Sequence, residues 1–229
     1  MVRDERYRQN HDGILQRLNE TAIPKYLRKV ATALGVEPHL DVLFHSPLRS
    51  RAWFDCYGGA AVDQFGNPLP WMPYSVIDFL SERVGKELRV FEYGSGNSTR
   101  WWSSHVGEVV CVEDDEYWYD EVSATLPANT EIRYETGDAY VDQICEHDPF
   151  DVISIDGSKR VECAKRAVDN LAEDGVIVFD DTFNKDYREG IEYLKERGFR
   201  EIFFQGMGPV TSNLQRTSIF YRDKNCFGI

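Results

Sequence analysis

Paired cysteines are missing from this 229-residue sequence. Its five cysteines form no Cys-x-x-Cys pair and are spread along the chain, at Cys56, Cys111, Cys145, Cys163 and Cys226. Disulfide frameworks and thiolate metal sites both need closely patterned cysteines, so we expect free thiols. Free thiols are typical of a reducing compartment, and the cytoplasm is therefore the expected location.

Long apolar runs and basic runs are missing as well. No stretch approaches the roughly 20 apolar residues that span a bilayer, and the charged N-terminus is not followed by an apolar segment of signal-peptide length. The 39 Asp and Glu residues outnumber the 26 Lys and Arg residues, which gives a net charge of -13. Because binding to a phosphate backbone requires a basic surface, we expect no nucleic-acid partner and no membrane partner. A small molecule or a glycan is the expected partner.

Residues 1–50 are charged and carry apolar residues at mostly three- and four-residue spacing. This spacing predicts two amphipathic helices that are interrupted at Pro24. Three uses of the segment stay open: a lid over a site, a surface for homodimer formation, or packing on the main domain.

Residues 51–74 mix aromatic residues with turn-forming Gly and Pro, which indicates an ordered loop. The loop either covers a sheet edge or forms a wall beside a substrate, in which case Trp53, Phe54, Trp71 and Tyr74 supply the wall. We divide the chain into an N-terminal helical segment with this aromatic loop, residues 1–74, and a main domain, residues 75–229.

Strand-like and helix-like patterns alternate from residue 88 onward, as in a doubly wound α/β sheet. Strands are expected at residues 89–93, 108–113, 131–134, 150–156 and 175–180, and helices at residues 75–83, 97–105, 116–124, 160–171 and 187–197, with a short helix ending near residue 146. Two further strands, at residues 200–205 and 217–222, have no helix between them and should be antiparallel. The expected fold is a seven-stranded, mostly parallel sheet that ends in an antiparallel hairpin and carries an N-terminal helical extension.

A glycine turn, Gly94-Ser95-Gly96, follows the first of these strands. Glycine lets the backbone approach a ligand closely because no Cβ intervenes. The next strand ends at Glu113, where a carboxylate can accept hydrogen bonds from both hydroxyls of a ribose. The pattern predicts a site for an adenosine-containing cofactor, and a strand-to-helix turn without a ligand is the alternative.

These strands, the terminal hairpin and the loop motifs resemble the class I S-adenosylmethionine-dependent methyltransferases over residues 75–222. The resemblance implies that the first loop wraps the methionine part of the cofactor, that Glu113 takes the ribose hydroxyls and that Asp138 contacts the adenine amino group. The cofactor-binding residues expected on this basis are Glu92, Tyr93, Gly94, Ser95, Gly96, Asn97, Ser98, Glu113, Asp114, Asp138, Ala139 and Asp156.

A dinucleotide such as NAD is the rival cofactor. A dinucleotide fingerprint needs a third glycine three residues after the second, where the helix packs against the strand beside the pyrophosphate. Position 99 is Thr, and the glycine loop lies far from the start of the chain. The pattern therefore favours S-adenosylmethionine.

Three carboxylates follow two neighbouring strands, at Asp156, Asp180 and Asp181. The carboxyl ends of parallel strands lie side by side at the edge where ligands bind. Carboxylates gathered there repel one another unless something neutralises them, and Mg²⁺ with oxygen ligands would do so. The alternative is that Asp156 contacts the methionine ammonium group while Asp180 and Asp181 cap the following loop.

This acidic pattern resembles the metal-dependent O-methyltransferases of the catechol type and those that act on sugars. The resemblance implies Mg²⁺ held by Asp156, Asp180 and Asp181, which grips two vicinal hydroxyls of the acceptor, and proton removal by Lys159. Asp156 and Lys159 are thus the candidate catalytic residues, with a histidine as the other candidate base. The expected activity is O-methylation of a small molecule or sugar, and a cofactor-binding protein without catalysis is the alternative from another class.

Overall fold

The computed structural model describes residues 25–229. The chain divides into two compact units, residues 1–55 and residues 56–229. The aromatic loop, which the sequence grouped with the N-terminal segment, therefore falls largely in the second unit. None of the helices in the described part of the chain is long and apolar enough to cross a membrane.

The first unit is helical where it is described. Its helices are α2 (Lys25–Ala33), α3 (Glu37–His45) and α4 (Pro47–Ser50), and α5 (Trp53–Cys56) crosses into the second unit. Pro38 stands in the first turn of α3, where its missing N–H leaves no helical hydrogen bond unmade. The first of the two predicted helices and the break at Pro24 lie outside the described residues.

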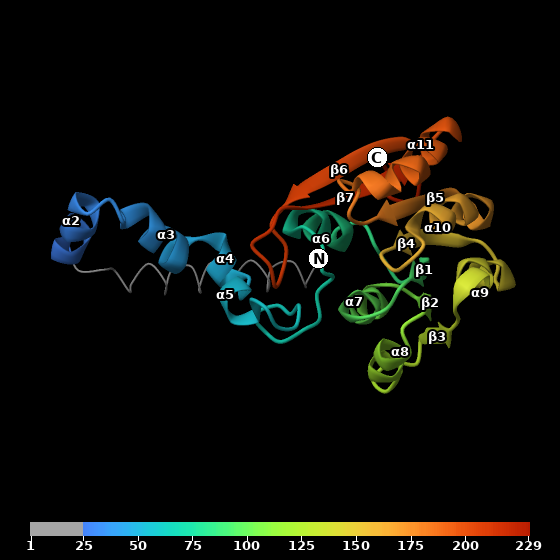
Figure 1. The fold of residues 1–229 in the computed structure, drawn as a ribbon, viewed down its shortest axis with the longest axis horizontal. Coiled ribbons are helices and arrows are strands. Elements are labelled where there is room, and N and C mark those ends of the chain that lie inside the picture. The colour runs from blue at the N-terminus through green and yellow to red at the C-terminus, as the bar shows by residue number, and fades with distance from the viewer. Residues whose placement is uncertain (1–24) are drawn as a thin grey trace. The chain divides into compact units, whose positions relative to one another are not determined.

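The second unit is built on one sheet with the strand order β3-β2-β1-β4-β5-β7-β6 (Figure 1). Strands β1 to β5 are parallel, and β7 is antiparallel to both β5 and β6. The strands are β1 (Arg89–Tyr93), β2 (Glu108–Glu113), β3 (Thr130–Tyr134), β4 (Phe150–Ile155), β5 (Leu171–Phe179), β6 (Arg200–Gly206) and β7 (Gln215–Tyr221). The predicted sheet with its terminal antiparallel hairpin is confirmed.

Helices connect the strands in the order that the sequence predicted. They are α6 (Tyr74–Ser81), α7 (Asn97–His105), α8 (Glu116–Ser123), α9 (Gly137–Asp142), α10 (Arg160–Ala167) and α11 (Arg188–Glu196), with 3-10 turns η1 (Gln143–Glu146), η2 (Val168–Asn170) and η3 (Lys185–Tyr187). The central strands read as nearly continuous apolar runs because both faces of a parallel sheet are covered by helices. Their side chains form the main core, in which Phe91, Phe150 and Phe179 are fully buried.

Strand β5 is longer than expected. It begins at Leu171 rather than at residue 175, and its pairing with β4 shifts register between Phe150 and Val152. The sequence Glu173-Asp174-Gly175 has the composition of a turn, but here Gly175 lies inside an irregular strand. A Cβ at Gly175 would come within 2.6 Å of the Leu171 side chain, so a glycine suits this place.

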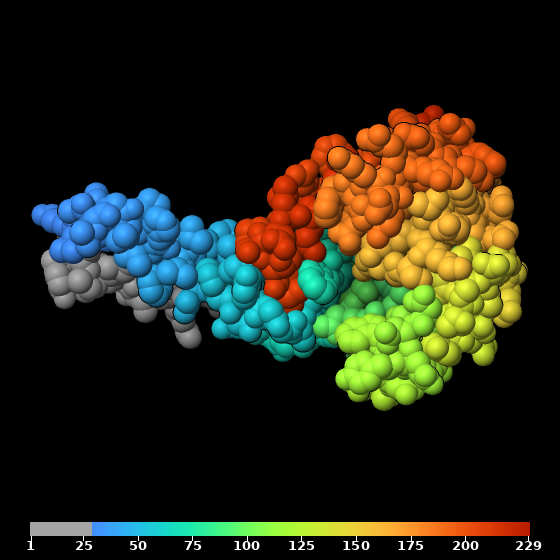
Figure 2. Space-filling view, in the orientation of Figure 1, coloured from blue at the N-terminus to red at the C-terminus, as the bar shows by residue number. Residues whose placement is uncertain are grey.

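The loop at residues 57–73 lies beside the loop that connects β6 and β7 (Figures 1 and 2, cyan and red). The Gly58 amide donates to the Val210 carbonyl at 2.9 Å, and the Tyr74 amide donates to the Met207 carbonyl at 2.9 Å. The Asn97 side chain donates to the Ala61 carbonyl at 2.8 Å and so joins the loop to α7. The loop is thereby fixed next to the glycine turn.

Candidate functional site

Strand register brings the predicted site residues to one edge of the sheet. Tyr93 is paired with Val112 and with Ile155, and Ile155 is paired with Phe179. The residues that come next, Gly94, Glu113, Asp156 and Asp180, therefore leave the sheet side by side. This is the carboxyl edge, where ligands of open α/β sheets bind.

Two glycines hold the ends of β1 and β4 close together at this edge. Gly94 has a φ of 97°, and a Cβ on it would lie 3.0 Å from the backbone nitrogen of Gly157. A Cβ on Gly157 would overlap the Tyr140 hydroxyl and lie 2.8 Å from the nitrogen of Gly94. The two backbones can approach this closely only because neither residue has a side chain.

Glu113 is oriented by three donors. Its Oε1 accepts from the backbone amides of Asp114 and Asp115 at 3.0 and 3.1 Å, and its Oε2 accepts from the Ser95 hydroxyl at 2.7 Å. A carboxylate has about four lone-pair sites, so Glu113 keeps one for a ligand hydroxyl. Its position at the end of β2 suits a contact with one ribose hydroxyl, whereas the sequence predicted contacts with both.

Glu92 is a fully buried carboxylate with one unused oxygen. Its Oε2 accepts a 2.5 Å hydrogen bond from the Thr99 hydroxyl, which in turn accepts from the Gly96 amide at 2.9 Å. Its Oε1 has no hydrogen-bond partner among the described residues. Burial raises the pKa of Glu92 from 4.5 to about 7, although the Thr99 hydrogen bond opposes the rise. A buried acceptor of this kind calls for a donor from a ligand.

A cavity of about 390 Å³ lies over these groups. Its lining consists of Glu92, Gly94, Ser95, Ser98, Glu113, Asp114, Trp118, Asp156, Gly157 and Ser158. Seven of these, Glu92, Gly94, Ser95, Ser98, Glu113, Asp114 and Asp156, belong to the predicted cofactor set. The residues fit S-adenosylmethionine, because Glu92 Oε1 offers a partner for its ammonium group and Glu113 offers a partner for one ribose hydroxyl.

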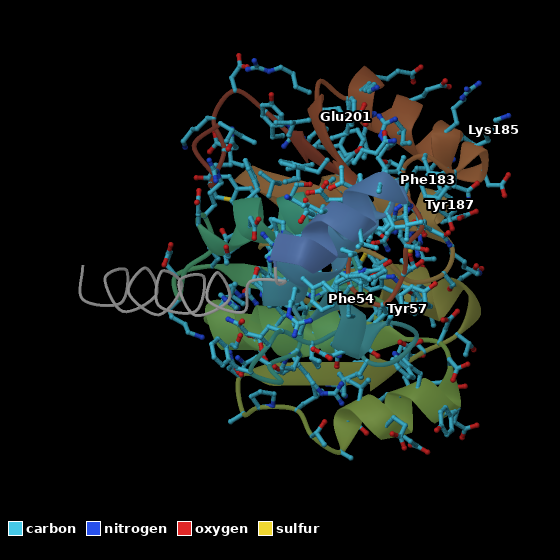
Figure 3. The ribbon with its side chains drawn as sticks, turned by 90° about the vertical axis from the view of Figure 1, so that its left-hand side faces the viewer. Phe54, Tyr57, Phe183, Lys185, Tyr187 and Glu201 are labelled. Atoms are coloured by element: carbon cyan, nitrogen blue, oxygen red, sulfur yellow. The ribbon has the colours of Figure 1, made fainter. Side chains whose placement is uncertain are left out.

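A larger cavity of about 620 Å³ adjoins the first and shares Ser95, Ser98, Trp118 and Asp156 with it. Exposed apolar side chains in its lining are Trp71, Phe183 and Leu214, each more than half exposed. Figure 3 labels Phe183 in the segment that follows β5. Of the four predicted wall residues in the aromatic loop, Trp71 is in this lining, Tyr74 is buried, and Trp53 and Phe54 belong to the first unit.

The three predicted acidic residues do converge on this larger cavity, together with Arg160. Arg160 Nη2 lies 3.1 Å from Asp156 Oδ1, and Nη1 lies 3.4 Å from Asp181 Oδ2 and 3.9 Å from Asp180 Oδ2. Burial raises the pKa of Asp156 to about 7, and the positive charge of Arg160 opposes this rise. Burial, with repulsion from Asp156 and Asp181, also raises the pKa of Asp180, while a hydrogen bond from Thr217 opposes it.

These residues do not fit a bound Mg²⁺. Mg²⁺ requires oxygen ligands at about 2.1 Å in octahedral geometry, and no group of three or more acidic, histidine or cysteine side chains in residues 25–229 is arranged to hold a metal ion. The Arg160 guanidinium already lies among the three carboxylates. The expectation of a metal rested on the absence of any other neutralising charge, and Arg160 supplies that charge.

Gly96 and Asn97, also predicted to bind the cofactor, line the larger cavity only, and the remaining predicted residues lie apart from both cavities. The Tyr93 side chain is buried in the core, where its hydroxyl donates to the Val141 carbonyl at 2.8 Å. Lys159 Nζ lies 3.5 Å from Asp138 Oδ1, and neither residue, nor Ala139, is in the lining of either cavity. Of the two candidate catalytic residues, only Asp156 faces both cavities.

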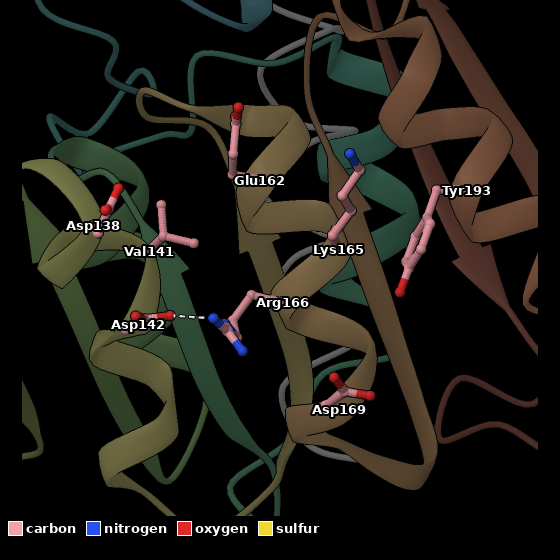
Figure 4. A pocket seen from close by; sticks show the side chains of 8 residues that line it. All are labelled: Asp138, Val141, Asp142, Glu162, Lys165, Arg166, Asp169 and Tyr193. Atoms are coloured by element: carbon pink, nitrogen blue, oxygen red, sulfur yellow. Dashed lines mark ion pairs between the residues drawn. The ribbon is translucent and has the colours of Figure 1, made fainter.

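Asp138 instead lines a third cavity of about 460 Å³ (Figure 4). Its lining, Asp138, Val141, Asp142, Glu162, Lys165, Arg166, Asp169 and Tyr193, shares no residue with the other two. Arg166 pairs there with Asp142 at 2.5 Å. Both signs of charge occur in this lining, and nothing in it connects with the site at the sheet edge.

Sequence reasoning missed Arg160 and Trp118. Arg160 stands four residues after Asp156, at the first position of α10, a spacing that could have indicated a pair. Asp115 caps α8 by accepting from the Trp118 amide at 2.9 Å, and the Trp118 indole donates to the Ser95 carbonyl at 2.6 Å. Phe183 and Leu214 lie in irregular segments, where no periodic pattern marks a side chain as facing a cavity.

Strained backbone accompanies the larger cavity. Asp181 and Val210 both line it and have left-handed φ values of 57° and 61°. Such values are uncommon for residues other than glycine, above all for β-branched valine. Strain of this kind persists where the surrounding structure holds it, and it concentrates at functional sites.

Comparison with known proteins agrees with this geometry. Residues 91–182 match the family model described as a methyltransferase domain. This segment runs from β1 to the residues after β5 and so includes the glycine turn and all three acidic residues. We found no match among the curated proteins.

Solved structures share the fold at low sequence identity. The precorrin 8w decarboxylase of Methanobacterium thermoautotrophicum is 19% identical, with a TM-score of 0.53 over 64% of this chain and 87% of that one. A proposed methyltransferase of Streptococcus mutans, in complex with S-adenosylhomocysteine, is 15% identical, with a TM-score of 0.51 over 65% and 97% of the two chains. An S-adenosylmethionine-dependent O-methyltransferase of Thermotoga maritima is 15% identical, with a TM-score of 0.51 over 65% and 63%.

The family match, the sheet order and the cofactor cavity agree on the class of protein. The chain contains a methyltransferase domain with the class I fold. It resembles the S-adenosylmethionine-dependent methyltransferases in the sequence of residues 91–182 and in the order of its strands.

Proposed function

We propose that the protein transfers a methyl group from S-adenosylmethionine to a hydroxyl oxygen of a small-molecule or sugar acceptor, which binds in the larger cavity. The observation that carries the proposal is the continuity of the two cavities, which share Ser95, Ser98, Trp118 and Asp156. Methyl transfer requires the acceptor oxygen in line with the reactive methyl group, so two adjoining cavities are the arrangement it needs.

S-adenosylmethionine supplies the electrophilic methyl group when it is bound. Glu92 and Glu113 hold its ammonium group and its ribose at the ends of β1 and β2. Trp71, Phe183 and Leu214 contact the ring or apolar part of the acceptor and displace water from it. The protein thereby contributes mainly by positioning the two reactants.

Proton removal from the acceptor hydroxyl falls to Asp156 in this proposal. Asp156 borders both cavities, so it lies where the acceptor oxygen and the methyl group meet. Lys159 is held by Asp138 outside both linings. General-base catalysis requires the base to reach the hydroxyl directly or through one water molecule, and this requirement favours Asp156 over Lys159.

Incubation with S-adenosylmethionine and a panel of phenols, catechols and sugars tests the function. We expect mass spectrometry to show a methylated product with the wild-type chain and none with Glu113→Ala. Binding of S-adenosylhomocysteine without turnover on any acceptor would instead support a cofactor-binding protein without catalysis. Binding of NAD in place of S-adenosylhomocysteine would contradict the proposal.

A further inference from the structure

The three carboxylates at the ends of β4 and β5 pose an electrostatic problem that every ligand of the larger cavity meets. The side chain of Asp180 is nearly fully buried and that of Asp156 is 24% exposed. Like charges so close together in a poorly solvated place destabilise the fold unless a positive charge lies among them. Enzymes with a similar acidic edge solve this with a bound divalent cation, as the resemblance noted above implies.

Arg160 meets all three carboxylates from the first position of α10, and its side chain is only 11% exposed. It makes three backbone hydrogen bonds in addition. Nε donates to the Gly157 carbonyl at 2.8 Å, Nη2 to the Asp156 carbonyl at 2.7 Å and Nη1 to the Asp180 carbonyl at 3.0 Å. The guanidinium thus binds the ends of both strands.

A planar guanidinium group suits the position between the ends of β4 and β5. Arg160 presents five N–H donors in one plane, and it also lies over the Tyr187 ring, 5.2 Å from the centroid. Tyr187 lies a few residues after Asp180 and Asp181 in the chain (Figure 3). A lysine would bring a single ammonium group and could not reach carbonyls and carboxylates of both strands at once.

We propose that Arg160 is the permanent cation of the acceptor site, and that it stands where a divalent metal ion would otherwise be bound. It is a positioning residue, which holds Asp156 and Asp181 at the cavity without touching the reacting atoms. This inference rests on the proposed function, which assigns the larger cavity to the acceptor.

The proposal also restricts the chemical class of the acceptor. A metal ion in this place would grip two vicinal hydroxyls, whereas Arg160 already uses its donors on the protein. An acceptor with a single hydroxyl is therefore sufficient. Three carboxylates face one guanidinium in the lining, so the cavity disfavours acceptors that carry a carboxylate or phosphate group.

Binding of Mn²⁺ tests the proposal without any need for turnover. Electron paramagnetic resonance measures binding as the loss of the signal of free Mn²⁺. Three forms of the full chain are compared: the wild type, Arg160→Met and Arg166→Met. Arg166→Met is the matched control because Arg166 lies on the same helix and pairs with Asp142, and its replacement removes the same charge from the chain. We expect the wild type and Arg166→Met to show the same weak surface binding. Arg160→Met should gain one stoichiometric site, because the three carboxylates, which are not arranged around a metal ion while they pair with Arg160, are then released to turn toward one.

Thermal melts with and without millimolar Mg²⁺ provide the second measurement. Mg²⁺ should raise the melting temperature of Arg160→Met and leave that of the wild type unchanged. A folded Arg160→Met variant that gains no Mn²⁺ site would contradict the proposal. Stoichiometric Mn²⁺ binding by the wild type that disappears in Asp180→Asn would overturn it, even if Arg160→Met does not fold. Neither result depends on methyl transfer, so failure of this inference is distinguishable from failure of the proposed function.

Discussion

Replacing Glu92 with glutamine should stabilise the ligand-free protein at alkaline pH and weaken its binding of S-adenosylhomocysteine. Glutamine has nearly the same shape, so the Thr99 hydroxyl can still donate to the side-chain oxygen. What changes is the charge. The ionised carboxylate is fully buried and has one oxygen without a partner among the described residues, whereas the amide is neutral.

The magnitude follows from the pKa of Glu92. A rise from 4.5 to about 7 means that the folded state binds the proton more tightly than the unfolded state. At about 1.4 kcal/mol for each factor of ten, this favours folding by about 3 kcal/mol at low pH, and the gain is lost as the pH rises through about 7. The glutamine variant has no proton to lose. Its unfolding free energy should therefore rise relative to wild type by about 2–3 kcal/mol between about pH 5 and pH 8.

Urea denaturation of the wild type and the variant across this pH range measures the difference, because the other titrating groups are common to both. Glu121→Gln, at an exposed position on α8, is the control for the loss of one carboxylate from the chain. The reasoning is refuted if the Glu92→Gln difference is also independent of pH. It is equally refuted if the variant binds S-adenosylhomocysteine as tightly as the wild type, because Glu92 would then have no part in holding the ammonium group.

Three further outcomes are expected. Gly157→Ala should destabilise the fold by about 1–3 kcal/mol in chemical denaturation, because the added methyl group overlaps the Tyr140 hydroxyl; unchanged stability would contradict the close approach of β1 and β4. With an acceptor in hand, Asp156→Asn should lower kcat by about a hundredfold or more while Lys159→Met keeps most of it, and the reverse order would make Lys159 the base. S-adenosylhomocysteine should bind more tightly as the pH rises towards about 7, by up to about tenfold per pH unit, because its ammonium group pairs with ionised Glu92; calorimetry at several pH values would expose a flat profile.

Apolar periodicity in the sequence was sufficient to predict the sheet. The runs that became β1, β2 and β4 are buried on both faces, and a parallel strand has no polar face to obscure the pattern. The start of β5 was missed because Glu173, Asp174 and Gly175 are turn-forming residues by composition. Only their pairing with β4 makes them a strand.

The gathering of the candidate cofactor residues at one edge was also predictable from the sequence, because the order of the strands brings the glycines and acids at their ends together. Gly94, Glu113 and Asp156 come to one edge in any sheet with this register. The sequence predicted Asp138 in the same site, but the structure does not place it in the lining of either cavity at this edge. The direction of its side chain depends on the start of α9 and on the ion pair with Lys159. Arg160 was missed because the motif consists of the acidic residues alone and does not include the cation four residues after Asp156.

Calorimetric titration of S-adenosylhomocysteine into the wild-type chain and into Glu113→Ala is the most direct test of the central claim, that the edge formed by β1, β2 and β4 is an S-adenosylmethionine site. We predict saturable binding to one site per wild-type chain and a loss of that binding in the variant, with the unfolding transition of the variant intact. No binding to the wild type, or equal binding to both proteins, would contradict the account.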